Sequence, residues 1–121
     1  MKIRIKGDSV RFRLTQTEVR ELSENGKIYD HTNFGNAKFQ YGVILDDNID
    51  DLQVSFVHNS ILLQMPITIG KDWYSNDIIT YQNRIETSQG TKLYLLLEKD
   101  FTCLDNTTED QSDNYPNPKL S

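Results

Sequence analysis

Few residues in this chain are of the kinds that commit a protein to one chemistry. There is a single cysteine, Cys103, so no internal disulfide can form, which agrees with a reducing compartment. Only two histidines occur, His31 and His58, and neither has an identifiable partner in the sequence. No Gly-x-Ser-x-Gly nucleophile elbow, phosphate-binding glycine loop or paired-cysteine zinc pattern is present. The sequence therefore indicates no reaction, and we lean against an enzyme.

Long apolar runs are also lacking. The opening residues, MKIRI, do not form the apolar core of a signal peptide, and every later apolar run is far shorter than the ~20 residues that span a membrane. We therefore expect a cytoplasmic protein that does not contact a membrane. As a separate expectation, the protein needs no cofactor. With 121 residues, 36% of them hydrophobic, the chain can bury one core, and we predict a single globular domain over residues 1–100.

The alternation of apolar and polar residues predicts a protein built mainly from strands. Residues 2–6 and 9–14 alternate around Gly7-Asp8, a pair that suits a tight turn, so they should form a hairpin. Six further segments are rich in aromatic and β-branched residues, at 27–34, 38–45, 52–57, 60–65, 78–85 and 91–100. About eight strands, mostly in hairpins, predict an α+β fold with a strongly curved antiparallel sheet or a partly closed barrel, a flat sandwich being the alternative.

One helix is expected at about residues 16–25. Thr15 is placed as its N-cap, Glu18 as the capping-box partner three residues later, and Gly26 as the stop signal. A second, short helical turn carrying Trp73 is a weaker expectation within residues 70–77. Beyond residue 100 the chain has no period, so we predict an extended acidic tail over 101–121. We expect this tail to dock through a few side chains such as Phe101 and Tyr115, the alternative being that it does not dock.

Charge is distributed unevenly along the chain. The net charge is −5, yet residues 1–14 carry five cations and one carboxylate, while residues 15–121 carry eight cations and 17 carboxylates. In a hairpin that turns at Gly7-Asp8, Arg4 would lie opposite Arg11 and Lys2 opposite Arg13. Such pairs destabilise a sheet by up to roughly 1 kcal/mol each unless water or an anion relieves them. We call these five cations the cation ladder: Lys2, Arg4, Lys6, Arg11 and Arg13.

Two hypotheses account for the cation ladder. In the first, the protein is a small binding domain, and its basic hairpin face engages its own acidic tail or an acidic protein partner. In the second, an enzyme or binding protein holds a phosphorylated small molecule there, with arginine forks on phosphate oxygens and a divalent metal on tail carboxylates. The first is our leading prediction. Nucleic acid is a poorer candidate, because a pI near 4.9 opposes long-range attraction to a polyanion.

The tail also gathers side chains that ligate divalent cations. Its candidates lie within the stretch CLDNTTEDQSD, and they are Cys103, Asp105, Glu109, Asp110 and Asp113. Their spacing matches no metal motif, so we interpret this stretch as a solvated acidic segment and expect no resident metal.

Several stretches carry a resemblance to a known family. With MKIRIKGDSVRFRLTQTEV at the start, FGN and KDWYSND in the middle, and LLLEKDFTCL followed by EDQSDNYPNP at the end, the chain resembles a family of short bacterial proteins classed as a domain of unknown function. The resemblance runs nearly end to end. It implies that the tail belongs to the native unit, and it brings no activity, substrate or catalytic residue with it.

A looser similarity connects basic strands in a barrel with the triphosphate tunnel enzymes, which bind triphosphate through inward-pointing Arg and Lys and a metal through glutamates. That similarity implies a ladder that lines a cavity. The family's Glu-x-Glu-x-Lys strand is absent, because Lys2, Arg4 and Lys6 occupy the alternating positions of the first strand. This departure argues against metal-dependent hydrolysis of a triphosphate.

Overall fold

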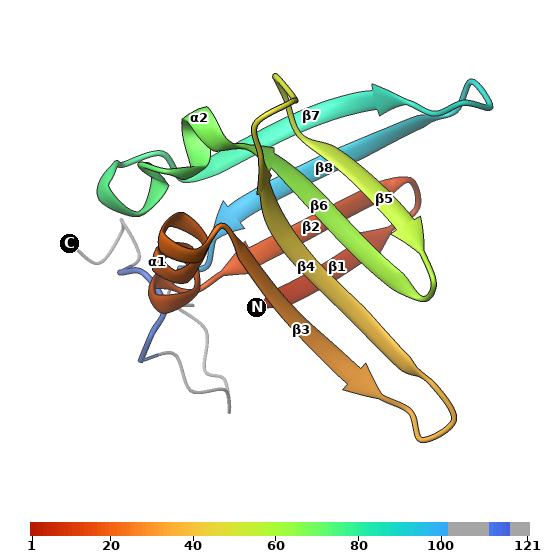
Figure 1. The fold of residues 1–121 in the computed structure, drawn as a ribbon, viewed down its shortest axis with the longest axis horizontal. Helices are drawn as coiled ribbons and strands as arrows, with labels where there is room; N and C mark the ends of the chain where they lie inside the picture. The colour runs from red at the N-terminus through yellow and green to blue at the C-terminus, as the bar shows by residue number, and fades with distance from the viewer. Residues whose placement is uncertain (102–111, 117–121) are drawn as a thin grey trace.

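The structure is a computed structural model, and it describes residues 1–101 and 112–116. Its elements follow the predicted order of hairpins around one capped helix (Figure 1). They are β1 (Lys2–Lys6), β2 (Ser9–Leu14), α1 (Gln16–Asn25), β3 (Lys27–Asn33), β4 (Lys38–Asp46), β5 (Gln53–Val57), β6 (Ser60–Pro66), α2 (Ile67–Gly70), the 3₁₀ turn η1 (Trp73–Ser75), β7 (Thr80–Glu86) and β8 (Lys92–Lys99).

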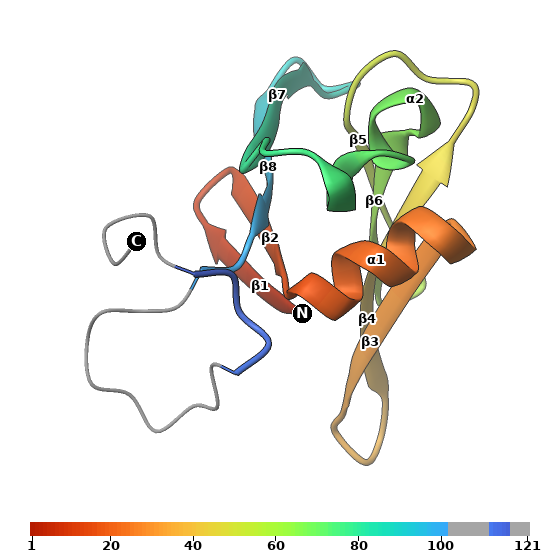
Figure 2. The same ribbon diagram turned by 90° about the vertical axis from the view of Figure 1, so that its left-hand side faces the viewer.

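The eight strands form two four-stranded sheets that face each other. The first sheet has the order β1-β2-β8-β7 and the second has the order β3-β4-β6-β5. Figure 2 shows the sheets as two layers, with α1 and the segment containing α2 bridging the space between them at one end. Side chains from both sheets fill that space, among them the fully buried Phe12 and Leu97 of the first sheet and Val43 and Leu63 of the second.

The predicted antiparallel pairing is wrong at the centre of each sheet. β2 pairs with β8 in parallel, and β4 pairs with β6 in parallel, whereas the outer pairs are antiparallel hairpins. Each sheet is therefore two hairpins joined through their second strands. Among the described residues the ladders divide the strands between two sheets and do not close them into one barrel. Local alternation specifies a hairpin, but it does not say which hairpins lie side by side.

Helix α1 begins and ends where its capping residues predict. The Thr15 hydroxyl accepts a hydrogen bond from the Glu18 amide at 3.4 Å, and the Glu18 carboxylate accepts one from the Thr15 amide at 2.9 Å. Gly26 adopts the left-handed conformation, with φ of 81°, and its amide donates to the Leu22 carbonyl. The helix buries Val19 and Leu22 against the core, so one end of the molecule is closed by a locally specified element.

The capping box predicts a measurable contribution to stability. Thr15→Ala should lower the free energy of unfolding by about 1 kcal/mol, because the Glu18 amide loses its acceptor. Thr15→Ser keeps the hydroxyl and should lose only a small part of this. The measurement is urea denaturation followed by circular dichroism, and an equal loss in both variants would show that the cap is not the cause.

The helical turn expected within residues 70–77 is present as η1, and a second short turn that was not predicted, α2, precedes it. α2 begins directly after Pro66, and η1 carries the fully buried Trp73. Pro66 ends β6 and stands directly before the first residue of α2, a position where proline is compatible with the start of a helix. From the sequence, this proline was interpreted only as the end of a strand.

The described part of the tail, residues 112–116, lies against the domain. The Tyr115 amide donates to the Asp100 carbonyl, and the Gln16 amide donates to the Asp113 carbonyl. The rings of Phe101 and Tyr115 pack with their centroids 5.7 Å apart. This segment therefore connects the end of β8 with the first turn of α1.

Candidate anion-binding face

The outer face of the first sheet carries all five basic residues that the hairpin pattern placed together. The register of β1 and β2 is as predicted, with Lys2 opposite Arg13 and Arg4 opposite Arg11. Because side chains alternate across a strand, and Val10, Phe12 and Leu14 are buried, the cation ladder points away from the core. The cations therefore do not line a cavity between the sheets as they would in a tunnel.

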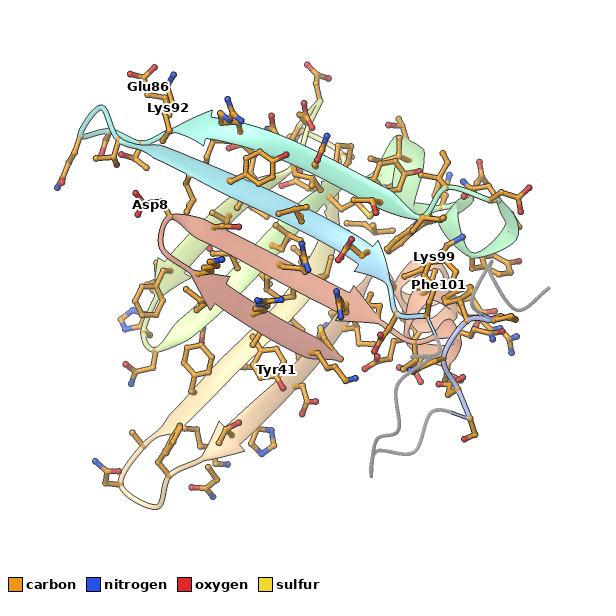
Figure 3. All side chains as sticks on the ribbon, turned by 180° about the vertical axis from the view of Figure 1, so that it is seen from behind. Asp8, Tyr41, Glu86, Lys92, Lys99 and Phe101 are labelled. Carbon is orange, nitrogen blue, oxygen red and sulfur yellow. The ribbon has the colours of Figure 1, made fainter. Side chains whose placement is uncertain are left out.

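Pairing of β2 with β8 and of β8 with β7 extends this surface across four strands. We define the basic face as the outward side chains of the first sheet, which are Lys2, Arg4, Lys6, Ser9, Arg11, Arg13, Thr80, Gln82, Arg84, Glu86, Lys92, Tyr94, Leu96 and Glu98. It holds seven of the 13 lysines and arginines and two of the 18 acidic residues, a net charge of +5 on a chain of net charge −5. Figure 3 looks onto this face, and no described helix or strand lies in front of it.

One carboxylate neutralises part of the cation ladder. The same oxygen of Glu98, on β8, lies 3.2 Å from Arg11 Nε and 3.3 Å from Arg13 Nε. Its other oxygen accepts a hydrogen bond from the Thr80 hydroxyl at 3.3 Å. Glu98 thus sits between two cations that the hairpin alone would leave in mutual repulsion, which explains how the sheet tolerates the ladder.

A second carboxylate meets the ladder at its other edge. Asp100 is 5% exposed, and its Oδ2 lies 3.3 Å from Lys2 Nζ. Its backbone amide donates to the Leu14 carbonyl, so this carboxylate is fixed where β2 and β8 end. The carboxylates that relieve the ladder, Glu98 and Asp100, belong to residues 1–100 and not to the predicted acidic tail of 101–121.

Arg4 differs from Arg11, its partner across the hairpin. Within the part of the chain that the structure describes, no carboxylate lies within 4.0 Å of its guanidinium, although Arg11 directly opposite is paired with Glu98. Arg4 borders an open depression of about 280 Å³, whose lining residues are Lys2, Ile3, Arg4, Arg11 and Arg13. An exposed arginine beside a depression with a second arginine opposite can offer forked donors to one oxyanion.

The other half of the basic face was not identified from the sequence. The Arg84 guanidinium lies 5.2 Å from the ring centroid of Tyr94, and the Tyr94 hydroxyl donates to Gln82 at 2.8 Å. A second, more open depression of about 310 Å³ is bordered by these three residues and Asn83. The alternation of side chains in β7 and β8 places Gln82, Arg84 and Tyr94 on one face. That face becomes continuous with the cation ladder only through the non-local pairing of β2 with β8.

A buried lysine holds the docked tail segment. Lys99 is 5% exposed, and its Nζ donates to the Asn76 carbonyl at 2.6 Å. The ammonium lies 5.8 Å from the ring centroid of Trp73 and 5.2 Å from that of Tyr115. Burial lowers the pKa of Lys99, with Asp77 acting in the opposite direction, and burial raises the pKa of Tyr115. These contacts connect β8 with η1 and with the described segment of the tail.

Of the five metal candidates of the tail, Asp113 alone lies among the described residues. Cys103, Asp105, Glu109 and Asp110 lie outside the described residues. Asp113 accepts a hydrogen bond from the Thr17 hydroxyl at 3.0 Å, at the first turn of α1, where a carboxylate complements the helix dipole. Across residues 1–101 and 112–116, no three His, Cys, Asp or Glu side chains come together as a set of metal ligands.

Among the described residues, no helix is both long enough and apolar enough to cross a membrane.

Comparison with known proteins places the chain in a family. No curated protein and no solved structure gives a significant match. The model of a family of unknown function, DUF7009, matches residues 1–119, and the protein therefore belongs to that family.

Proposed function

We propose that the protein is a small cytoplasmic binding domain whose basic face holds an acidic partner. One observation carries this proposal: seven cations and only two carboxylates share one sheet face, which no described helix or strand covers, in a chain that is acidic elsewhere. Repulsion among these cations is a cost to folding that Glu98 and Asp100 offset only in part. Concentrated charge of one sign that costs stability, on a face that no described element covers, favours a surface that attracts an oppositely charged partner.

Binding is better supported than catalysis. Glu98, the carboxylate that contacts Arg11 and Arg13 of the first depression, is already engaged by these two guanidinium groups and by the Thr80 hydroxyl. His31 and His58 belong to the second sheet and its hairpin turn, away from the basic face. The face therefore offers positive charge and hydrogen-bond donors without a group poised to move a proton. Because these side chains lie on the outside, the proposal does not depend on a partly closed barrel.

A phosphorylated small molecule is the second candidate. The depression of about 280 Å³ beside Arg4 and Arg11 favours it, because its volume suits a few phosphate groups. Both candidates use the same arginines, and they differ in whether a compact ligand or an extended acidic chain is bound.

The test compares two anions by isothermal titration calorimetry at low salt. Poly-glutamate represents an acidic protein, and tripolyphosphate represents a phosphorylated small molecule. We expect at least one to bind, and Arg4→Ala to weaken that binding about tenfold through loss of a charged hydrogen-bond donor. Lys38→Ala, which removes the same charge from the second sheet, should change it by less than about twofold. Binding of neither anion, or equal losses in the two variants, would refute the proposal.

A substitution of Glu98 should strengthen anion binding, the opposite of the effect expected for Arg4→Ala. Glu98→Gln removes the carboxylate that competes for Arg11 and Arg13, and the amide still fills the same space. We therefore expect tighter binding of whichever anion the wild-type protein binds, and a lower free energy of unfolding without ligand.

A further inference from the structure

Two subsites of different chemistry lie on the basic face. The first, beside Arg4 and Arg11, is lined by cationic side chains and by the aliphatic side chain of Ile3. The second contains the half-buried ring of Tyr94 with Arg84 over it and the Gln82 side-chain amide at its edge. A guanidinium that lies over a tyrosine ring extends the planar surface of that ring, and a flat unsaturated ring can stack on the guanidinium plane or on the part of the ring that remains exposed. The two subsites therefore suit a ligand that carries both phosphates and flat rings.

The distance between the subsites excludes a single phosphate as their common ligand. The first subsite spans β1 and β2, and the second spans β8 and β7, the next two strands of the same sheet. With neighbouring strands about 4.8 Å apart, the subsite centres are separated by about 10 Å across the strands, and they are further offset along them. A ligand that occupies both must be extended, with anionic groups repeated along it.

The spacing of the cations agrees with an extended polyanion. Along the hairpin, three successive levels carry Lys2 with Arg13, then Arg4 with Arg11, then Lys6. These levels are about 6.8 Å apart, the repeat of same-face residues in a strand. Four of the seven cations on the basic face are arginines, whose planar forks match phosphate geometry. An acidic protein would satisfy the cations, but it has no need of the Tyr94 ring or the Gln82 amide.

The acidic pI of the whole chain does not oppose this ligand at short range. The basic face has a net charge of +5, so the other side chains together account for −10. At physiological salt, charges more than about 8 Å apart are largely screened, and a ligand on the sheet responds chiefly to the face that it touches. Long-range attraction is weak, and binding should therefore depend on contacts rather than on steering.

We infer that the basic face binds single-stranded nucleic acid, with phosphates along the cation ladder and at least one base stacked beside Tyr94. This inference rests on the proposed function and specifies its partner. An open four-stranded sheet that presents an aromatic ring together with cations is a physical arrangement suited to unpaired bases. Duplex bases are already stacked on each other, and only their backbone could contact this face.

The test is fluorescence anisotropy of the full chain with labelled oligonucleotides of about twelve nucleotides, a length within the range of single-strand sites. Oligo-uridine, oligo-thymidine and a duplex are compared at several salt concentrations. We expect the single strands to bind about tenfold more tightly than the duplex, with affinity that falls as salt rises. Tyr94→Leu should weaken single-strand binding about tenfold through loss of stacking. Tyr74→Leu, which truncates an exposed tyrosine of η1, should change it by less than about twofold.

Arg84→Ala is the second variant, because Tyr94→Leu also removes packing from β8. It should weaken single-strand binding without unfolding the protein, which circular dichroism checks. If tripolyphosphate or poly-glutamate binds while no oligonucleotide does, the inference fails and the proposed function stands. If no anion binds, both fail. Equal affinity for single strands and duplex, or the same loss in Tyr94→Leu and Tyr74→Leu, would also overturn the inference.

Discussion

Replacing Trp73 with alanine is expected to lower the free energy of unfolding by about 3–5 kcal/mol, the range for removal of a large buried aromatic side chain. Trp73 is fully buried, and its indole nitrogen donates to the Ile78 carbonyl at 2.8 Å. Its ring meets that of Tyr81 edge to face, with centroids 5.5 Å apart, and also lies near the buried ammonium of Lys99. The substitution would therefore leave a cavity, an unpaired carbonyl and a less well supported buried charge.

The adjacent tyrosine provides the matched control. Tyr74 is 48% exposed, and Tyr74→Ala removes an aromatic ring of similar size from the same turn. We expect this variant to lose less than about 1 kcal/mol, as is usual for a substitution at the surface. Urea denaturation of both variants gives the comparison. A loss for Trp73→Ala no larger than that for Tyr74→Ala would mean that η1 does not anchor the core.

Gly42→Ala should also be strongly destabilising, by about 1–3 kcal/mol, the range for overpacking a well-filled site. In most strands the same change would stabilise the protein slightly, because alanine restricts the unfolded chain. Gly42 lies opposite Tyr29 on the outer face of the second sheet. A Cβ at this position would overlap the Tyr29 ring and lie 2.6 Å from the Ile28 carbonyl oxygen. A lower free energy of unfolding in Gly42→Ala would therefore show that crowding at this site outweighs the usual gain from replacing glycine with alanine.

A double substitution identifies which neighbour causes that loss. In a Tyr29→Ala background the ring is gone, but the Ile28 carbonyl belongs to the backbone and cannot move without disturbing β3. Gly42→Ala should therefore cost less in this background than in the wild-type protein, yet still more than zero. Thermal or urea unfolding of the four proteins measures the difference. A stabilising effect of Gly42→Ala in either background would show that the strand pair adjusts freely.

How much could be predicted from the sequence depended on how local each feature is. Helix α1 and the β1–β2 register were predicted correctly, because Thr15, Glu18 and Gly7 lie within a few residues of the groups they organise. The parallel β2–β8 and β4–β6 pairs were missed, because alternation in one strand carries no information about a distant partner strand. The predicted antiparallel sheet was consequently wrong at these two pairs.

The same limit applies to the candidate site. The cation ladder was found because its residues share one hairpin, and the need for a neutralising anion followed from their charge alone. Glu98 could not be identified as that anion, because it reaches Arg11 and Arg13 only through the β2–β8 pairing. Tyr94 and Arg84 were missed for the same reason, and with them the aromatic half of the basic face.

The two sheets make different demands on the order of folding. The second sheet is built from one continuous stretch, residues 27–66, whose strands can meet as soon as they are synthesised. The first sheet joins the two ends of the domain, and Arg13 and Glu98, which are in contact, are 85 residues apart in the chain. Closing so long a loop is entropically costly and slow, so the N-terminal hairpin must wait for β8 to leave the ribosome. The basic face is thus completed later than the second sheet, and a nascent chain cannot present all four of its strands before β8 has been synthesised.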